Sequence, residues 1–282
     1  MADLTQPAIA EFLADLRQFY EESGRHAMAW RQPGPDGSYD PYKILVSELM
    51  LQQTQVVRVA PKYEAFIIRF PDVQSLAAAS LGEVLTLWSG LGYNRRAKYL
   101  HLTAAAVAGN YSGLFPQSAD ELQKLPGVGP GTAGAIAAYA YDQPVVYLET
   151  NVRTVLIHHF IADTEGIPDQ ELRDILLRII TIESFHDYFT PREFYWALMD
   201  YGSSLKKSVG NLSRASAGFV KQSTFHGSRR QVRGQVLKLL TNQSLTIAAL
   251  AEITPDERLD SVLVDLEKEH LITQKGGVYF LD

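Results

Sequence analysis

The turn at residues 125–132, Leu-Pro-Gly-Val-Gly-Pro-Gly-Thr, constrains the fold more than any other stretch of the chain. Leu122 and Leu125 precede it at helical spacing and a run of small residues follows it, so the turn joins two helices in a hairpin. Because glycine has no Cβ, backbone N–H groups can approach a ligand closely there, and the second helix offers unpaired donors to an anion. We expect contact with nucleic-acid phosphate, made by Gly127, Val128, Gly129, Gly131 and Thr132. An ordinary glycine-rich turn between helices is the alternative.

Basic residues are unevenly distributed in this chain, whose formal net charge is −6. No Asp or Glu occurs from Tyr201 to Ala251, whereas that stretch holds Lys206, Lys207, Arg214, Lys221, Arg229, Arg230, Arg233 and Lys238. A run of like charge is usually a solvated face, but the loss of every acid over so long a stretch favours phosphate contact. Lys206, Lys207 and Lys221 are the residues that we select as candidate DNA contacts.

The absence of cysteine narrows the possible chemistry. With Cys 0 in 282 residues, the chain cannot form disulfides, thiolate metal sites or cysteine-ligated iron–sulfur clusters. His158 and His159 are adjacent on an expected helix and cannot face one site, so we expect no metal and no cofactor. No apolar run approaches the roughly 20 residues of a membrane span, and the first residues lack the features of a secretory signal. We expect a cytoplasmic, nucleoid-associated protein without a membrane partner.

Apolar spacing predicts a mainly α-helical fold with a separate C-terminal unit. The expected helices of the larger part cover residues 8–23, 40–56, 61–70, 75–88, 150–160, 169–183 and 191–204. Residues 211–228 show little periodicity, which predicts a linker. Beyond it, expected helices at 229–240, 246–251 and 256–269 precede a hairpin at Gly276-Gly277, an order typical of a winged helix that binds DNA or only protein. The acidic third helix favours a packing or partner role over groove reading.

The expected helix at 40–56 carries polar residues, Glu48 and a glutamine-rich block, among its apolar residues. Glu48 lies among apolar residues and is either solvated, which the pattern favours, or buried with a raised pKa that suits proton donation near neutrality. Gln52 and Gln53 follow it. Their amides either fill a gap in a base stack or contact base edges, or simply lie on the surface.

Two further segments open helices. Gly90-Leu91-Gly92-Tyr93 leads into Arg95 and Arg96, which combines a stacking platform with phosphate partners; a core tyrosine with solvated arginines is equally compatible. Glu149 precedes a helix that Thr150 or Asn151 can cap. The helix start would keep its carboxylate ionised, although an ordinary solvated acid explains the pattern as well.

Together these segments resemble the MutY-type adenine DNA glycosylases of the helix-hairpin-helix superfamily, which also includes endonuclease III. The motifs are Trp30-Arg31, residues 47–55, Gly90–Tyr93, the 125–136 hairpin and residues 148–153. The resemblance covers residues 8–205 and implies a two-lobed helical fold with DNA in the cleft between the lobes. The expected parts are a terminal lobe (1–30 with 142–210), a helical-barrel lobe with the hairpin (31–141), a basic linker (211–228) and a winged-helix-like domain (229–282).

The resemblance also implies roles for individual residues. Glu48 is similar to the catalytic glutamate that protonates the adenine leaving group, Gln52 and Gln53 to residues that enter the duplex, Tyr93 to an intercalating tyrosine, and Asn151 to an asparagine beside the catalytic carboxylate. The expected activity is base-excision repair of double-stranded DNA by a monomer that removes adenine opposite 8-oxoguanine or guanine. A flipped nucleotide would lose its base while Glu149 stabilises or attacks the sugar cation.

Three positions and the C-terminal tail depart from the pattern of this family. Glu149 stands where the family has aspartate, Gly131 where the endonuclease III branch has its Schiff-base lysine, and Lys206 at the first of four expected cluster cysteines. A short tail, whose partner is DNA or a protein, replaces a NUDIX-like domain. These departures leave open a glycosylase for another base, such as thymine or uracil opposite guanine, and a non-catalytic mismatch-binding protein.

Overall fold

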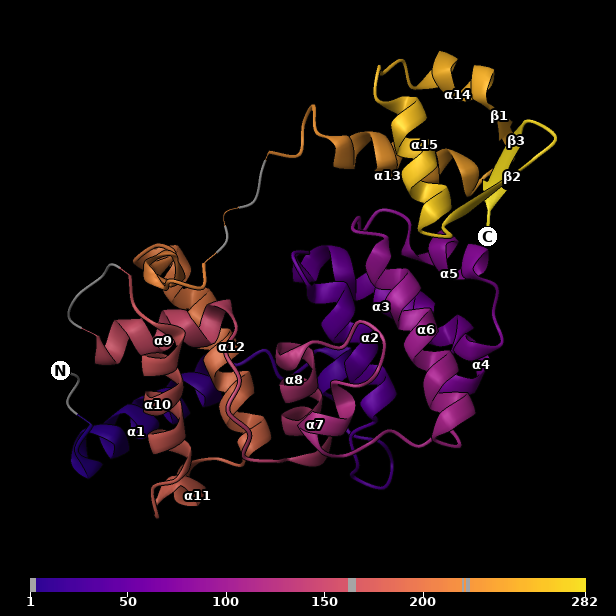
Figure 1. Cartoon of the computed structure of the whole chain (residues 1–282). Helices are drawn as coiled ribbons and strands as arrows, with labels where there is room; N and C mark the ends of the chain where they lie inside the picture. Colours follow the sequence, from indigo (N-terminus) through magenta and orange to yellow (C-terminus); the bar gives the residue numbers. More distant parts are fainter. Residues whose placement is uncertain (1–3, 162–165, 220, 222–223) are drawn as a thin grey trace. The chain divides into compact units, whose positions relative to one another are not determined.

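A computed structural model describes residues 4–161, 166–219, 221 and 224–282 of the chain (Figure 1). The fold is mainly helical, as predicted. The described elements up to the hairpin are α1 (Gln6–Ser23), η1 (Ala29–Arg31), α2 (Pro41–Leu51), α3 (Val56–Arg69), α4 (Val73–Ala77), α5 (Leu81–Trp88), α6 (Arg95–Asn110), α7 (Ala119–Leu122) and α8 (Pro130–Tyr141). Those that follow are α9 (Thr150–Phe160), α10 (Asp169–Ile180), α11 (Phe185–Tyr188), α12 (Pro191–Ser208), η2 (Leu212–Ala215), α13 (Arg229–Leu240), β1 (Leu245–Thr246), α14 (Ile247–Ile253), α15 (Leu259–Lys268), β2 (Ile272–Lys275) and β3 (Val278–Leu281).

Two compact units divide the chain in a way that differs from the expected lobes. The first unit comprises Met1–Ile44, Gln117–Gln123 and Gly129–Lys221, and the second comprises Leu45–Pro116, Lys124–Val128 and Gln222–Asp282. Helix α8 therefore belongs with the terminal helices, and the tail belongs with helix α2, which carries Glu48, and with the loop before α6, which carries Tyr93.

Close packing explains why α8 joins the first unit. A Cβ at Gly134 would lie 2.6 Å from the Cβ of Tyr147, so only glycine admits this tyrosine against α8. Tyr147 stacks on Tyr195 of α12 with ring centroids 4.2 Å apart, and Tyr139 of α8 stacks on Trp196 at 5.6 Å. These aromatic contacts, together with apolar burial, attach α8 to α12.

A capping box interrupts one of the expected helices, and a loop at the glutamine residues interrupts another. Residues 75–88 form the end of α4 and all of α5, because Ser80 and Glu83 make a capping box that starts a new helix. Helix α2 ends at Leu51, and Gln53 has a left-handed backbone with φ of 56°. The glutamine residues therefore lie on a loop between α2 and α3.

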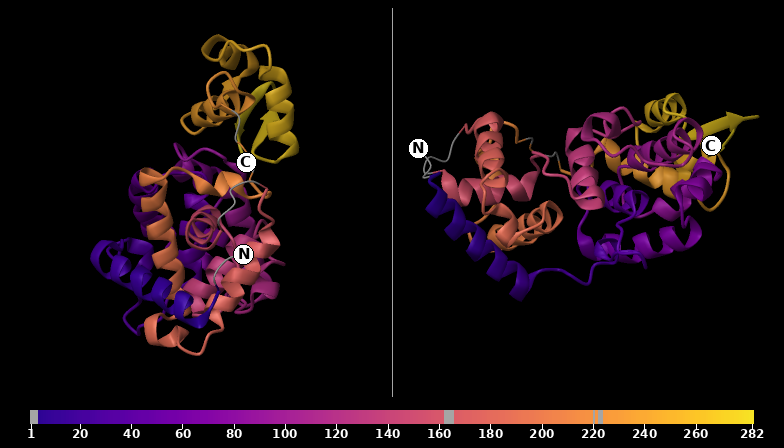
Figure 2. Two further views of the ribbon diagram at one scale, coloured as in Figure 1. Left: turned by 90° about the vertical axis from the view of Figure 1, so that its left-hand side faces the viewer. Right: turned by 90° about the horizontal axis from the view of Figure 1, so that it is seen from below.

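The tail has the order of elements that the sequence predicts for a winged helix. Helices α13, α14 and α15 are combined with a three-stranded antiparallel sheet in the order β1-β3-β2 (Figures 1 and 2). Helix α13 packs against α15, and Val236, Leu263 and Leu266 are buried. The tail thus has an apolar core of its own.

The expected linker at 211–228 is folded over its first part. Residues 212–215 form η2, and Ile167 pairs with Ser216 in an isolated parallel bridge. The Ser216 hydroxyl donates to the Asp169 carboxylate over 2.6 Å. Because these contacts join residues far apart in sequence, periodicity could not reveal them.

A search of the described residues for membrane-spanning helices finds none of sufficient length and hydropathy.

Candidate active site

Glu149 forms the N-cap of α9 in the first unit. Its carboxylate accepts hydrogen bonds from the backbone N–H of Asn151 at 2.5 Å and of Val152 at 3.0 Å. These donors are two of the N–H groups that a helix start leaves without intrahelical partners. The structure therefore assigns to Glu149 the capping role that the sequence suggested for Thr150 or Asn151, and it places the carboxylate at the positive end of the helix.

Lys206 and Asn151 complete a polar cluster around this carboxylate. The Lys206 ammonium donates to Asn151 Oδ1 over 2.7 Å. A Cβ at Gly202 would lie 2.5 Å from the Asn151 carbonyl oxygen, so glycine is what lets α12 approach the first turn of α9. The cluster joins Glu149, Asn151 and Lys206 through this close helix contact.

Burial and the neighbouring charges and N–H groups shift the pKa values of Glu149 and Lys206 in opposite directions. Burial raises the pKa of the Glu149 carboxyl, while the N–H of Val152, the charge of Lys206 and the N–H of Asn151 lower it; the net shift is upward. Burial also lowers the pKa of Lys206, and Glu149 opposes that change. A carboxylate held in this way can stabilise a positive charge that develops beside it.

The position of Lys206 differs from the prediction that this residue contacts phosphate, because its ammonium group faces Asn151 and Glu149. Lys207 and Lys221 are exposed, and their contact with phosphate stays a prediction. Arg229 of the basic stretch pairs with Asp265 of α15, and Arg233 pairs with Glu269 at the C-cap of α15, each over 2.6 Å. The acidic helix thus neutralises part of the basic stretch.

The second unit carries Glu48 and the two glutamines. Glu48 is half-buried on α2 between buried Ser47 and Leu49, so its environment lies between the two extremes that the pattern left open. Gln52 and Gln53 are exposed on the loop that follows. Their amide groups therefore stand on the surface of this unit.

Arg96 is a correction to the expected set of DNA contacts. Its side chain is buried and donates to the carbonyl oxygens of Leu49 at 2.6 Å, Met50 at 3.0 Å and Gly92 at 3.0 Å. Burial lowers the pKa of Arg96 to about 10. Because the guanidinium faces these carbonyls, Arg96 joins the end of α2 to the Gly90–Tyr93 loop and does not present its charge to phosphate.

Tyr93 and Arg95 remain on the surface. The Tyr93 side chain is 37% exposed, and its backbone is left-handed with φ of 48°. This conformation is rare for a bulky residue and indicates a segment held by its surroundings. Arg95 pairs with Glu269 at 3.3 Å.

The hairpin divides into a packing part and an open part. Gly127 has φ of 73°, and a Cβ there would lie 2.4 Å from Tyr99 Cβ, so this glycine is needed for packing. Val128 is buried and its N–H donates to the Leu125 carbonyl, which differs from its expected role as a ligand contact. Helix α8 begins at Pro130, so the N–H groups of Gly131 and Thr132 lie in its first turn, where helices leave donors for an anion. Cβ atoms built at Gly129 and Gly131 meet nothing within 4 Å.

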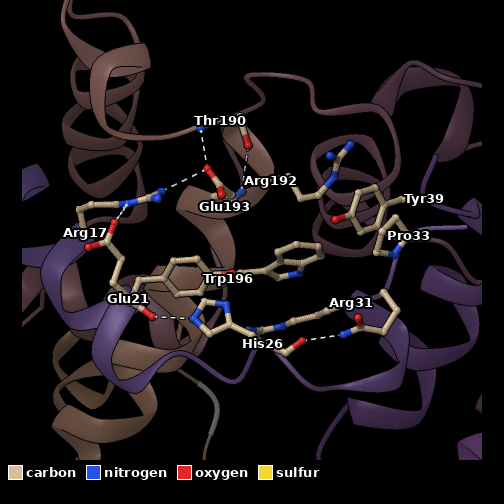
Figure 3. Close-up of a pocket in the computed structure, with 12 residues that line it drawn as sticks. Arg17, Glu21, His26, Arg31, Pro33, Tyr39, Thr190, Arg192, Glu193 and Trp196 are labelled. Carbon is tan, nitrogen blue, oxygen red and sulfur yellow. Dashed lines mark hydrogen bonds and ion pairs between the residues drawn. The ribbon is translucent and has the colours of Figure 1, made fainter. Parts of the chain in front are cut away.

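A separate cavity in the first unit is lined in part by Arg31 of the Trp30-Arg31 motif. It has a volume of about 530 Å³, and Arg31, Tyr39 and Trp196 line it (Figure 3). Arg31 forms two hydrogen bonds to the Asp200 carboxylate, at 2.8 and 2.9 Å, and Arg25 makes a further ion pair at 2.5 Å. Sequence reasoning missed Asp200, whose only signal was its place in Asp200-Tyr201-Gly202, directly before the expected cluster positions.

Sequence comparison with known proteins identifies the family of this chain. A family model described as "HhH-GPD superfamily base excision DNA repair protein" matches residues 46–180. The adenine DNA glycosylase of Mycolicibacterium smegmatis is 34% identical over 274 residues, which cover 89% of this chain and 90% of that protein. The chain belongs to the adenine DNA glycosylase family. A family member from Buchnera aphidicola (strain Bp) is 36% identical over 192 residues, and the match covers 68% of this chain and 52% of that longer protein.

Solved structures agree with the family fold. A thermostable thymine-DNA glycosylase has a TM-score of 0.59 at 21% identity, with 76% of this chain and 97% of that chain covered. An endonuclease III in a non-covalent DNA complex has a TM-score of 0.53 at 21% identity, with 68% and 85% covered. At these identities the likeness concerns the fold alone.

An iron–sulfur cluster, which the resemblance associates with this family, does not fit the residues of this chain. Such a cluster needs thiolate ligands, and the chain has no cysteine. The first expected ligand position is Lys206, whose ammonium binds Asn151. Among the described residues, no group of three or more His, Asp or Glu side chains could hold a metal ion.

Proposed function

We propose that this member of the adenine DNA glycosylase family removes mispaired adenine from double-stranded DNA, opposite 8-oxoguanine or guanine, by hydrolysis of the N-glycosidic bond. The observation that carries the proposal is the Glu149 carboxylate at the start of α9, held by two backbone N–H groups and close to Lys206. A site for cleavage of a glycosidic bond needs such an anion beside the sugar. The membership of the adenine DNA glycosylase family is what favours adenine as the base that is removed.

The proposed mechanism uses two carboxyl groups. The target adenine leaves the base stack, Glu48 transfers a proton to the departing base, and Glu149 stabilises the positive charge on the sugar until water adds. Asn151 and Lys206 are positioning residues, because they hold the first turn of α9 and its cap. Gly131 carries no amine, so the proposed enzyme is a monofunctional glycosylase.

DNA contacts are proposed for exposed groups of both units. Gln52, Gln53 and Tyr93 contact or separate bases, and the first turn of α8 binds a phosphate through the N–H groups of Gly131 and Thr132. Arg95, Lys207 and Lys221 add charge that the backbone attracts. The proposal does not require Arg96 or Val128 to touch DNA.

A panel of labelled duplexes tests the proposal. Excess protein is incubated with adenine opposite 8-oxoguanine, guanine or thymine, and with thymine or uracil opposite guanine, before alkali treatment. Strand breaks that require alkali, and that occur with adenine opposite 8-oxoguanine or guanine, support the proposed reaction. Cleavage of only the pyrimidine duplexes would assign another base to the site, and intact strands in every duplex would contradict a glycosylase activity.

Lys206→Met is expected to shift the acidic limb of the pH–rate profile to higher pH. Lys206 lowers the pKa of Glu149, so its loss raises that pKa and the ionised form of Glu149 disappears at a less acidic pH. Single-turnover rate constants for adenine release, measured across pH, report the shift. Lys207→Met removes the same charge from an exposed neighbour, and an equal shift in this control would refute the local role of Lys206.

Replacing Lys207 and Lys221 by Gln is expected to flatten the salt dependence of DNA binding. Each phosphate contact contributes about 0.9 to the slope of log K against log salt concentration, so the double variant should lose close to two such contributions. Fluorescence anisotropy at several salt concentrations measures the slope. Arg178→Gln, an exposed change on α10, is the control. An unchanged slope in the double variant would show that both lysines are only solvated.

A further inference from the structure

The tail contacts the segment that carries Tyr93, and one arginine makes the contact. The Arg230 guanidinium donates a hydrogen bond to the Tyr93 hydroxyl, and its carbon lies 5.3 Å from the centroid of the tyrosine ring. A guanidinium at this distance from an aromatic ring is attracted by it. Arg230 and Tyr93 are 137 residues apart in sequence, yet they belong to one compact unit.

The neighbours of Arg230 on α13 have different partners. Arg229 pairs with Asp265 and Arg233 with Glu269, so both charges are satisfied within the tail. Arg230 is directed instead to Tyr93 and, at 3.5 Å, to the carbonyl oxygen of Thr224. The contact is therefore specific to this position and does not reflect general basicity of α13.

A second set of contacts fixes the tail beside Tyr93. The Glu269 carboxylate, 20% exposed, pairs with Arg233 at 2.6 Å and with Arg95 at 3.3 Å, and the Glu269 backbone carbonyl accepts a hydrogen bond from Lys98. Arg95 and Lys98 lie in the first turn of α6, which Asn94 separates from Tyr93. The end of α15 thus docks on the helix that Tyr93 precedes.

Tyr93 is in a conformation that needs such support. Its φ of 48° is costly for a bulky side chain, and the half-exposed ring has the Arg96 guanidinium carbon 5.5 Å from its centroid. Arg96 is held by backbone carbonyls of α2 and of the Gly90–Tyr93 loop. Two guanidinium groups, one from α6 and one from the tail, therefore hold the ring.

We propose that Arg230 is a positioning residue that sets the orientation of Tyr93 for insertion into the DNA base stack, and that the winged-helix tail acts in base opening through this contact. The inference rests on the proposed function, because it assumes that Tyr93 enters the duplex. It gives the tail a task other than groove reading. The mycobacterial relative, whose match covers 89% of this chain, must share part of the tail, since residues 1–228 are too few for that coverage.

Base opening can be measured apart from base removal. The full chain carrying Glu48→Gln is mixed with a duplex that has 2-aminopurine next to adenine opposite 8-oxoguanine, and the rate of fluorescence rise reports unstacking. Arg230→Ala is expected to slow this rise about threefold to tenfold, because the variant loses one cation–aromatic contact and that is the change in rate which such a contact supports. Arg230→Lys should restore part of the rate, because it keeps the charge but not the planar group. Arg229→Ala, which removes a neighbouring charge paired within the tail, should change the rate little.

A double-mutant cycle tests whether Arg230 acts through Tyr93. If it does, Arg230→Ala adds nothing to the effect of Tyr93→Ala. Additive losses, equal losses in Arg229→Ala, or a loss of affinity with an unchanged opening rate would overturn the inference and mark Arg230 as a phosphate contact or a structural residue. Far-ultraviolet circular dichroism and unfolding of each variant exclude a misfolded tail, and Arg230→Lys provides a milder change.

Failure of this inference is distinguishable from failure of the proposed function. If the unsubstituted chain releases no adenine in the duplex panel, the proposed function fails. If that chain releases adenine, and Arg230→Ala opens the duplex at the rate of Arg229→Ala, the inference about Arg230 alone fails.

Discussion

Replacing Glu48 by Gln is expected to reduce the single-turnover rate constant for adenine release by about 10²–10⁴-fold, the usual range for loss of a general acid. Glutamine keeps the size of the side chain but cannot transfer a proton to the departing base. Glu48 is half-buried on α2 beside buried Ser47 and Leu49, so the isosteric change should leave the helix intact. Alkali-dependent strand cleavage of the adenine:8-oxoguanine duplex measures the rate constant.

Binding and a matched variant separate chemistry from folding in this experiment. The Kd of Glu48→Gln for the same duplex should remain within about threefold of the unsubstituted value, since the proposed role of Glu48 is in the transition state. Glu64→Gln changes an exposed acid on α3 and should leave the rate unchanged. Wild-type turnover in Glu48→Gln would remove this residue from the mechanism.

Replacing Asp200 by Asn is expected to lower the free energy of unfolding by about 3–5 kcal/mol, the usual cost of breaking a buried ion pair from one side. Asp200 and Arg31 have side chains 1% and 5% exposed, joined at 2.8 Å. Asparagine would leave the Arg31 charge buried without its counter-ion. Urea unfolding followed by circular dichroism measures the loss. The exposed pair of Arg17 with Glu21 is the comparison, and Glu21→Gln should cost less than about 1 kcal/mol.

The same ion pair makes stability depend on pH. Burial alone would raise the pKa of Asp200, but hydrogen bonds and charge from Arg31 and Arg25 dominate and lower it. A carboxyl group with a lowered pKa in the folded state contributes its full stabilisation above the unfolded value, about 3.9, and loses it as pH falls through the folded value. The stability difference between the parent and Asp200→Asn should therefore shrink as pH falls below about 4. A difference that stays constant down to pH 2 would contradict this account.

Local patterns in the sequence predicted the helices and several of their ends. Helix α13 covers Arg229–Leu240, the range that apolar spacing predicted, and the Gly276-Gly277 turn joins β2 to β3 as expected. Helix periodicity and turn chemistry act over a few residues, so they are readable without a fold. The family itself was identifiable because its motifs are short and occur in a fixed order.

Partners far apart in the chain could not be read in this way. From the sequence, Arg95 and Arg96 were equal candidates for phosphate contact, and Arg230 was one basic residue among eight in an acid-free stretch. The structure directs Arg96 to buried carbonyl groups and Arg230 to Tyr93. It turns Lys206 toward Asn151 and pairs Arg31 with Asp200, a carboxylate that no motif indicated.

The sequence by itself determined most of the helices, the hairpin, the winged-helix order of the tail and the family, since each depends on residues a few positions apart. Only the tertiary structure decided which charged groups are buried and which face solvent, and therefore which can contact phosphate. The physical reason is that the cost of burying a charge, and the partner that offsets it, depend on residues brought together by folding.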